Sequence, residues 1–346
     1  MKIIDLRSDT VTLPTDNMLR VMKNAHLGDD VFEEDPTVNK LEEKSAEIFG
    51  KESALIVPSG TMANLISVLA HCERGTEVIL GDKAHTFLYE AGGIAAFGGV
   101  HPRTLPNAKN GTINLDEIRS AIRSDNVHFP RTGLISLENT HNICYGSPLS
   151  KEYIDSVAIV AKSNNLPLHI DGARIFNASI ALNLPVNTLI ENVDSISFCL
   201  SKGLSCPIGS VICGKSDFIS KTRRIRKGLG GGMRQAGIIA APGLLALDEM
   251  IVRIKEDHLN AKILAEGINS IKGLHVELNL VKTNIVYFEL EDNLQEIDKV
   301  VVDLDKKGIK FFAIGLNRFR MVTNRGIDSF DIDRTLVELS SYFESI

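Results

Sequence analysis

The chain has 346 residues, of which 44% are hydrophobic and 24% charged, and its formal net charge is -6. This composition is typical of a globular protein, and the length exceeds that at which one core usually stops growing, so we expect a large domain and a smaller one. The only cationic cluster, residues 221–227, is short. An acidic chain without a basic footprint predicts no nucleic-acid partner.

Further classes are excluded by the apolar, cysteine and histidine patterns. No apolar segment approaches the length of a membrane span, and residues 1–7 alternate charged and apolar groups where a signal peptide needs an apolar block. We therefore expect no membrane association and a cytoplasmic location. The five cysteines form no C-x-x-C pair, so we expect them to be reduced. The nine histidines show no H-E-x-x-H spacing, and no metal site is predicted.

In chain order, the predicted elements alternate between helix and short strand, which indicates an α/β fold. The first clear helix is expected at about residues 37–49, because Pro36 precedes this segment and Gly50 closes it. A helical stretch is also expected from Thr61 to about His71. Short apolar runs bounded by turns predict buried strands. These strands are expected at residues 54–57, 77–80, 133–138, 166–171, 195–200 and 210–213.

After the glycine-rich stretch that ends at Gly237, the pattern changes. A long helical run is expected to about Lys272, followed by alternating segments at residues 275–280 and 284–290 and a helix at about residues 294–307. We predict a large domain at residues 1–250, with a mostly parallel sheet, and a smaller α+β domain at residues 251–346.

Two predicted strands each end in a charged residue and a turn. One leads to Asp171 and the other to Lys202 in a small-residue turn. Open α/β sheets bind ligands at the carboxyl edge of their parallel strands, so both side chains are expected near one site. A lysine there can carry pyridoxal phosphate (PLP) as a Schiff base, while the carboxylate keeps the pyridine nitrogen protonated. Each residue alone is equally consistent with a surface position in an ordinary loop.

The turn of Ser59, Gly60 and Thr61 is a candidate phosphate site. Glycine lets the backbone approach an anion closely, and the start of the following helix offers unpaired amide groups and a positive end. The alternative is an ordinary turn with a Ser/Thr N-cap. The turn lacks the lysine of a P-loop and the full G-x-G-x-x-G spacing, so nucleotide binding is not predicted.

Two histidines follow predicted strands and are candidates for acid/base chemistry. His85 lies after the strand at residues 77–80, where its imidazole could stack on a pyridine ring and exchange protons near neutral pH. His141 follows the strand at residues 133–138. Their positions do not decide between them, and either could be an ordinary surface or capping histidine.

Four cations are candidates for binding anionic groups. Arg174 follows Asp171 in the same turn, and Arg320 lies in the alternating segment of the smaller domain. The rigid guanidinium fork suits capture of an amino-acid carboxylate, although surface salt bridges are the alternative. Lys227 and Arg234 flank a glycine-rich stretch that could present cations to a phosphate or could be a solvated loop.

Taken together, these segments resemble the low-specificity L-threonine aldolases, which are PLP enzymes of fold type I, the aspartate-aminotransferase-like fold. The resemblance runs from the amino terminus into the smaller domain, in the right order. It is carried by LRSDTVT at residues 6–12, GDDVFEEDPTVNKLE at 28–42, PSGTMAN at 58–64, HIDGARIFNA at 169–178, CLSKGLSCPIGS at 199–210 and GGGMRQAG at 230–237.

The resemblance implies a role for each matching residue. Lys202 matches the Schiff-base lysine, Asp171 the partner of the pyridine nitrogen and His85 the imidazole that stacks on the cofactor. Gly60 and Thr61, beside Ser59, match the phosphate-binding turn. Ser8, Arg174 and Arg320 match residues that hold the substrate carboxylate. The cations matching Lys227 and Arg234 reach the cofactor of a neighbouring subunit in this family, which implies a homo-oligomer, commonly a tetramer.

The implied reaction is cleavage of L-threonine, L-allo-threonine or other L-3-hydroxy amino acids to glycine and an aldehyde such as acetaldehyde. His85, His141 or a bound water would take the β-hydroxyl proton. Three departures from the family pattern are Phe32, where tyrosine is frequent, Asn324, where histidine is common, and the stretch NICYGSPL after His141, which varies among relatives. They place the side-chain preference in doubt. A related PLP lyase, a racemase or a PLP-binding protein without activity are the alternatives.

Overall fold

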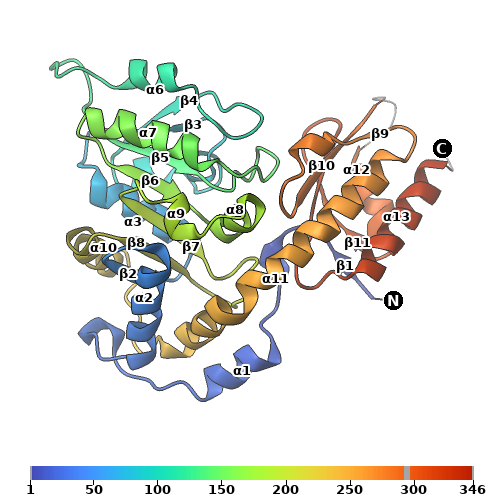
Figure 1. Cartoon of the computed structure of the whole chain (residues 1–346), viewed down its shortest axis with the longest axis horizontal. Coiled ribbons are helices and arrows are strands. Elements are labelled where there is room, and N and C mark those ends of the chain that lie inside the picture. Colours follow the sequence, from blue (N-terminus) through green and yellow to red (C-terminus); the bar gives the residue numbers. More distant parts are fainter. Residues whose placement is uncertain (1, 292–296, 345–346) are drawn as a thin grey trace.

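The computed structural model describes residues 2–291 and 297–344, which form two packed bodies connected by a long helix (Figure 1). The larger body is built on one sheet. Its strands are β2 (Ser53–Val57), β3 (Glu77–Gly81), β4 (His101–Leu105), β5 (Thr132–Glu138), β6 (Leu168–Asp171), β7 (Ser195–Cys199) and β8 (Ser210–Gly214). The seven strands are ordered β2-β8-β7-β6-β5-β3-β4, and β8 runs in the direction opposite to the other six. The predicted α/β class with a mostly parallel sheet is confirmed.

Helices cover both faces of this sheet because successive side chains of a strand point to opposite sides. Ile79 packs in a cluster with residues of α2 (Pro36–Phe49) and α7 (Lys151–Ser163). Val78 and Leu80 pack instead with residues of α3 (Gly60–His71) and α5 (Gly93–Ala96). The helices of this body are α1 (Asp16–Lys23), α2 (Pro36–Phe49), α3 (Gly60–His71), α4 (His85–Leu88), α5 (Gly93–Ala96), α6 (Leu115–Ala121), α7 (Lys151–Ser163), α8 (Ile175–Leu182), α9 (Val186–Leu189) and α10 (Ser216–Gly228), with 3-10 turns at Asp9–Val11 and Asp30–Phe32.

Helices α2 and α3 both begin at capping side chains. Asp35 accepts hydrogen bonds from the amides of Thr37 and Val38, both at 3.0 Å, and thereby starts α2. That helix ends at Gly50, whose φ of 61° lies in the left-handed region that glycine adopts without strain. Ser59 Oγ accepts from the amide of Met62 at 3.2 Å and starts α3. These caps explain why the predicted helix boundaries agree closely with the structure.

The smaller body combines an antiparallel sheet with the amino-terminal segment. Its sheet has the strand order β12 (Phe312–Ala313), β13 (Arg318–Val322), β10 (Ile285–Leu290) and β9 (Leu274–His275). Separately, β1 (Ile4–Asp5) pairs in parallel with β11 (Ile309–Lys310). The helices are α12 (Ile297–Lys306) and α13 (Ser329–Glu344), with a 3-10 turn at Leu278–Leu280.

The long helix α11 (Gly237–Asn269) contributes to the cores of both bodies. Ile254 and preceding residues of α11 pack in the core of the larger body, and Ala261 and later residues pack in the core of the smaller one. The boundary predicted between residues 250 and 251 therefore falls inside this helix, and it remains a prediction. Ile4 and Leu6, predicted to belong to the larger domain, are fully buried in the core of the smaller body.

Some predicted elements differ in extent. The segment at residues 275–280 is expected to alternate as a strand, but only its first residue continues β9, and a 3-10 turn follows. The helix expected at residues 294–307 is observed as α12, and its expected start lies outside the described residues. Strand β4 was not predicted, because its sequence, HPRTL, lies at the sheet edge and is only partly buried.

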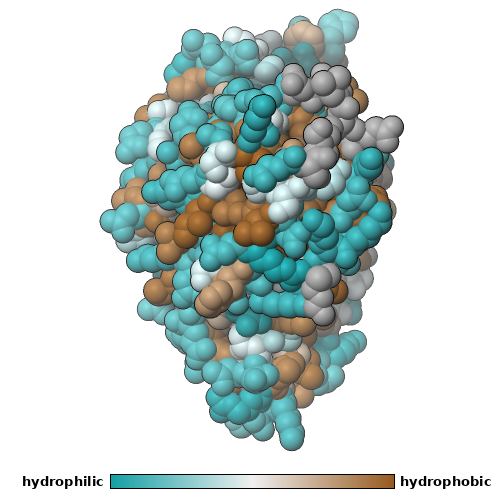
Figure 2. Space-filling model, turned by 90° about the vertical axis from the view of Figure 1, so that its right-hand side faces the viewer, coloured by the Kyte–Doolittle hydropathy of each residue, from teal (hydrophilic) through white to brown (hydrophobic). Residues whose placement is uncertain are grey.

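The face formed by the smaller body is mainly hydrophilic, with one hydrophobic strip across its middle (Figure 2). The longest helix, α11, has 33 residues, but its second half carries charges such as Arg253, Lys255 and Glu256. Within the described ranges, none of the helices has both the length and the apolar character that a membrane span requires.

Candidate active site

The predicted site residues gather at the carboxyl edge of the parallel strands. Asp171 is the last residue of β6, and Lys202 lies in the turn after β7. His85 begins α4 shortly after β3, while Glu138 ends β5. Because these strands are parallel neighbours, their carboxyl ends meet at one edge, where open α/β sheets bind ligands.

A cavity of about 320 Å³ lies at this edge, between the two bodies. It brings together Ser8, His85, Arg174, Lys202 and Arg320, which the sequence placed in one site from widely separated segments. The remaining lining residues are Arg7, Thr10, Val11, Asn142 and Phe312. Residues from the amino-terminal segment, the large sheet and the small sheet therefore form one concave surface.

Lys202 faces this cavity from a fixed backbone position. Its carbonyl accepts hydrogen bonds from the amide of Ser205 at 2.8 Å and from Thr12 Oγ1 at 3.1 Å. The side chain is partly buried and, among the described residues, forms no ion pair with a carboxylate. Its amine is therefore available to a ligand in the cavity.

Asp171 is 4% exposed and its two carboxylate oxygens have different partners. Oδ2 accepts from Asn64 Nδ2 at 2.8 Å, and Oδ1 accepts from the amide of Ala173 at 3.1 Å. Asn64 belongs to the first part of α3, and its Oδ1 accepts in turn from Ser197 Oγ at 3.0 Å. The amide of Asn64 thus holds the Asp171 carboxylate in one orientation.

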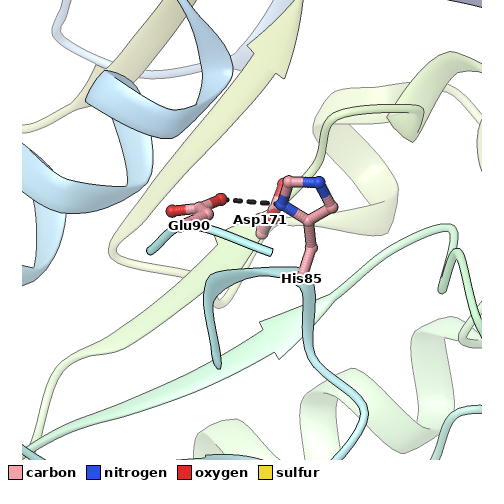
Figure 3. Close-up of side chains that lie close together, drawn as sticks. All are labelled: His85, Glu90 and Asp171. Atoms are coloured by element: carbon pink, nitrogen blue, oxygen red, sulfur yellow. Dashed lines mark hydrogen bonds and ion pairs between the residues drawn. The ribbon is translucent and has the colours of Figure 1, made fainter. Parts of the chain in front are cut away.

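His85, Glu90 and Asp171 form a compact polar group whose ligand-type atoms lie within 4.8 Å of one another (Figure 3). His85 Nδ1 donates to Glu90 Oε1 at 2.8 Å, and Asn64 Nδ2 donates to the same oxygen at 2.8 Å. Burial would lower the pKa of His85, but the hydrogen bond to Glu90 and the charge of Asp171 outweigh it and raise that pKa. Burial also raises the pKa of Glu90, against the hydrogen bond from His85, and the charge of Asp171 adds to the rise.

Arg174 is held by a carboxylate of the amino-terminal segment. Its Nε donates to Asp9 Oδ2 at 2.7 Å and its Nη2 donates to Asp9 Oδ1 at 2.6 Å. Asp9 is fully buried. Burial would raise the pKa of Asp9, but the charge and hydrogen bonds of Arg174 lower it to about 2. The fork of Arg174 is therefore occupied, and its Nη1 is the group directed to Asn142, at 3.3 Å.

Arg320, in contrast, has neutral acceptors. Its Nη1 donates to the carbonyl of Arg7 at 3.1 Å and its Nη2 to Asn142 Oδ1 at 2.8 Å. Its Nε has no hydrogen-bond partner in the described part of the chain, and no carboxylate there forms an ion pair with it. Burial lowers the pKa of Arg320. Asp9 acts on Arg320 through its charge but does not contact it, and a buried cation that no carboxylate contacts, at the wall of a cavity, is suited to an anionic ligand.

Ser59, Gly60 and Thr61 lie at the amino end of α3, next to the same sheet edge but outside the lining of the cavity. A Cβ on Gly60 would lie 2.9 Å from Cys199 Sγ, at the end of β7. Only glycine therefore allows α3 to start this close to the strand that leads to Lys202. The first amide groups of a helix have no partner within the helix, so this end can bind an anion.

Besides the phosphate turn and Asp171, three further predicted residues do not line the cavity. The His141 side chain is 1% exposed, its Nδ1 is 3.9 Å from Glu138 Oε1, and neither ring nitrogen has a hydrogen-bond partner among residues 2–291 and 297–344. Lys227 lines a separate hollow of about 360 Å³. Arg234 pairs on the surface with Asp29 at 3.0 Å.

Of the three departures from the family pattern, the stretch after His141 contributes Asn142 to the cavity lining, whereas the two single-residue departures lie outside the lining. Phe32 is 68% exposed in the 3-10 turn Asp30–Phe32. Asn324 is buried and donates from Nδ2 to the carbonyl of Asp5 at 3.3 Å, so it ties β1 to the smaller body. Phe32 and Asn324 therefore do not contact a substrate in the cavity of their own chain.

Sequence reasoning missed the residues that orient the predicted ones. They all lie beside or within the segments that drew attention, but a polar side chain does not reveal its partner in sequence. These residues are Asp9, Asn64, Glu90, Glu138 and Asn142. A larger surface hollow of about 880 Å³, at the amino-terminal side of the strands, contains none of the predicted site residues.

Comparison with known proteins now identifies the family. Residues 5–291 match the family model described as beta-eliminating lyase. The low-specificity L-threonine aldolase 1 of Arabidopsis thaliana is 49% identical over 340 residues, covering 97% of this chain and 95% of that protein. The chain belongs to the beta-eliminating lyase family, among the low-specificity L-threonine aldolases.

Solved structures of low sequence identity share its fold. The threonine aldolase of Leishmania major has a TM-score of 0.85 at 18% identity and covers 98% of this chain and 99% of its own. A structure of SPT with PLP has a TM-score of 0.78 at 16% identity, covering 99% and 88%. The prediction of the fold type I architecture is confirmed.

Proposed function

We propose that this chain cleaves L-threonine and L-allo-threonine, and more generally L-3-hydroxy amino acids, to glycine and an aldehyde such as acetaldehyde. The observation that carries the proposal is the single cavity that joins Lys202, His85 and Arg320 beside Asp171, with no ion pair to the guanidinium of Arg320 in the described ranges. The Arabidopsis relative, with 49% identity over nearly the whole chain, carries the name of this activity.

The residues present fit PLP as the cofactor. Lys202 offers an amine without an ion-pair partner in the described ranges, and Asp171 offers a buried, hydrogen-bonded carboxylate for the pyridine nitrogen. His85 would stack on the ring, and Ser59, Gly60 and Thr61 would hold the phosphate at the start of α3. When bound, PLP supplies an electron sink for the bond that is cleaved at Cα.

The carboxylate of the substrate would be held by Arg320, with Arg174 and Ser8 at the same cavity wall. Fixing this end of the amino acid orients the bonds at Cα and so selects which of them breaks. His85 would accept the β-hydroxyl proton at Nε2, because its Nδ1 is engaged with Glu90 Oε1. His141 does not reach the cavity in this chain, so the proposal assigns the proton to His85.

We further propose a homo-oligomer, with a tetramer as the expected state. Lys227 and Arg234 are exposed and lie away from the cavity of their own chain, which suits cations that serve the cofactor phosphate of a neighbouring subunit. The proposed location is the cytoplasm, and the proposed metabolic role is threonine breakdown with formation of glycine. Light scattering of the purified protein tests the assembly.

The reaction is tested by loading the protein with PLP and measuring acetaldehyde from L-threonine and L-allo-threonine. Borohydride treatment followed by peptide mass spectrometry should show a pyridoxyl adduct on Lys202, and Lys202→Ala should lose the adduct and nearly all turnover. Lys215→Ala, an exposed lysine before α10, is the matched control. A protein that carries the adduct yet forms no acetaldehyde from either isomer is not an aldolase. Pyruvate with ammonia, or a D-amino acid, would instead indicate elimination or racemisation.

A further inference from the structure

We propose that Asn142 is a positioning residue that makes the cavity selective for ligands with a carboxylate. It does so by holding Arg174 and Arg320 together with a neutral acceptor. The inference rests on the proposed function only in taking an amino acid as the ligand.

The side chain of Asn142 lies between the two guanidinium groups. Its Oδ1 accepts from Arg320 Nη2 at 2.8 Å and from Arg174 Nη1 at 3.3 Å. Both arginines are 7% exposed, and all three residues line the same cavity. Two like charges are thus kept close by one oxygen that bears no formal charge.

The backbone of Asn142 is fixed independently of its side chain. Its amide donates to Glu138 Oε1 at 2.7 Å, and its carbonyl accepts from Tyr287 Oη at 3.0 Å. The other carboxylate oxygen of Glu138, Oε2, accepts from the amide of His85 at 2.7 Å. Glu138 therefore sets the positions of Asn142 and His85 together, and a change of the Asn142 side chain leaves these anchors in place.

The neutral side chain of Asn142 leaves the positive charge of Arg320 available to a ligand. Asp9 engages Nε and Nη2 of Arg174, whereas the hydrogen bonds of Arg320 to residues of the described ranges go to a backbone carbonyl and to Asn142. The positive charge of Arg320 remains available because Asn142 does not cancel it. A substrate carboxylate adds an ionised acceptor for the same arginines, while Asn142 remains in place and holds them, and hydrogen bonds to an ionised acceptor are roughly twice as strong as those to a neutral one.

The decisive variant is Asn142→Asp, which places a permanent carboxylate between the two arginines. Binding of glycine, and of methylamine as the matched amine without a carboxylate, is followed in the PLP-loaded protein by the change in cofactor absorbance. Loss of one charge-assisted contact should weaken glycine binding roughly 10- to 100-fold, with methylamine affinity within about twofold of wild type. Asn114→Asp, at the exposed N-cap of α6, adds the same charge outside the cavity and should change neither affinity.

Asn142→Ala provides a second, neutral test. It removes the shared acceptor and should weaken glycine binding roughly two- to tenfold, again without affecting methylamine. This variant decides the question if the aspartate variant does not fold. Wild-type affinity for glycine in the folded variants, or an equal loss for both amines, would overturn the proposal. A wild-type protein that binds glycine selectively but releases no acetaldehyde would disprove the proposed reaction and leave the role of Asn142 intact.

Discussion

At the scale of single residues, Asp9 is the group on which Arg174 depends. Asp9→Asn keeps the shape but leaves a buried guanidinium without its countercharge. Removing one partner of a buried pair is expected to lower the free energy of unfolding by about 3–5 kcal/mol. Urea unfolding measures the change, with Asp125→Asn in an exposed loop as the control. Equal midpoints for the two variants would show that the pair contributes little.

Glu90 provides a second residue-scale prediction, through the pKa of His85. Glu90→Gln removes the carboxylate whose hydrogen bond helps to raise this pKa. The pKa of His85 should fall, so a reaction that needs neutral His85 extends to lower pH. The measurement is the acidic limb of the pH dependence of kcat/KM, with the exposed Glu73→Gln as the control. An acidic limb that stays in place would remove Glu90 from this role.

The same residues mark the limit of sequence reasoning at this scale. Lys202, Asp171 and His85 could be predicted because each follows a strand whose carboxyl end faces the ligand edge. Glu90 and Asn142 could not, because their importance comes from a hydrogen bond across the fold. Arg174 was predicted to bind a carboxylate, and the structure shows that its fork already holds that of Asp9.

At the scale of elements, apolar runs predicted the central strands, because a buried parallel strand needs apolar side chains on both of its faces. The sequence did not indicate which strands pair with one another. The antiparallel direction of β8 and the edge position of β4 depend on chain crossings that leave no local pattern. The insertion of β1 beside β11 was likewise hidden, because two residues are too few to show a period.

This short strand should nevertheless contribute measurably to stability. Ile4 is 0% exposed and Ile3, its neighbour, is 58% exposed. Ile4→Ala should lower the free energy of unfolding by about 2–5 kcal/mol, because it leaves a cavity in the core of the smaller body. Ile3→Ala should stay within about 0.5 kcal/mol of wild type. Chemical denaturation of both variants provides the comparison, and similar losses would mean that β1 is not packed as described.

At the scale of the whole molecule, buried histidines make stability depend on pH. Burial, with a contribution from nearby His71, lowers the pKa of His169 to about 3, whereas the ordinary value is 6.5. Below pH 6.5 His169 is protonated in the unfolded chain, whereas in the folded protein it stays neutral down to about pH 3. Stability should therefore fall with decreasing pH in this window, by about 1.4 kcal/mol per pH unit for this group.

His169→Gln should reduce that slope. Unfolding by urea at pH 7.5 and at lower pH values measures it, and His101→Gln, at the exposed start of β4, serves as the control. His169 Nδ1 lies 2.8 Å from Ser195 Oγ, a contact that glutamine can also make. The slopes of the variant and the wild type should differ, and identical slopes would exclude His169 as a source of acid sensitivity.

The contact between the amino-terminal segment and β13 also has a consequence for biosynthesis. The carbonyl of Arg7 receives its hydrogen bond from Arg320, across 313 positions of the chain. As the polypeptide leaves the ribosome, Arg7 must wait for Arg320 to be translated before the two can join. Ribosome-bound fragments that stop short of Arg320 should thus contain a folded central sheet but no completed carboxylate pocket.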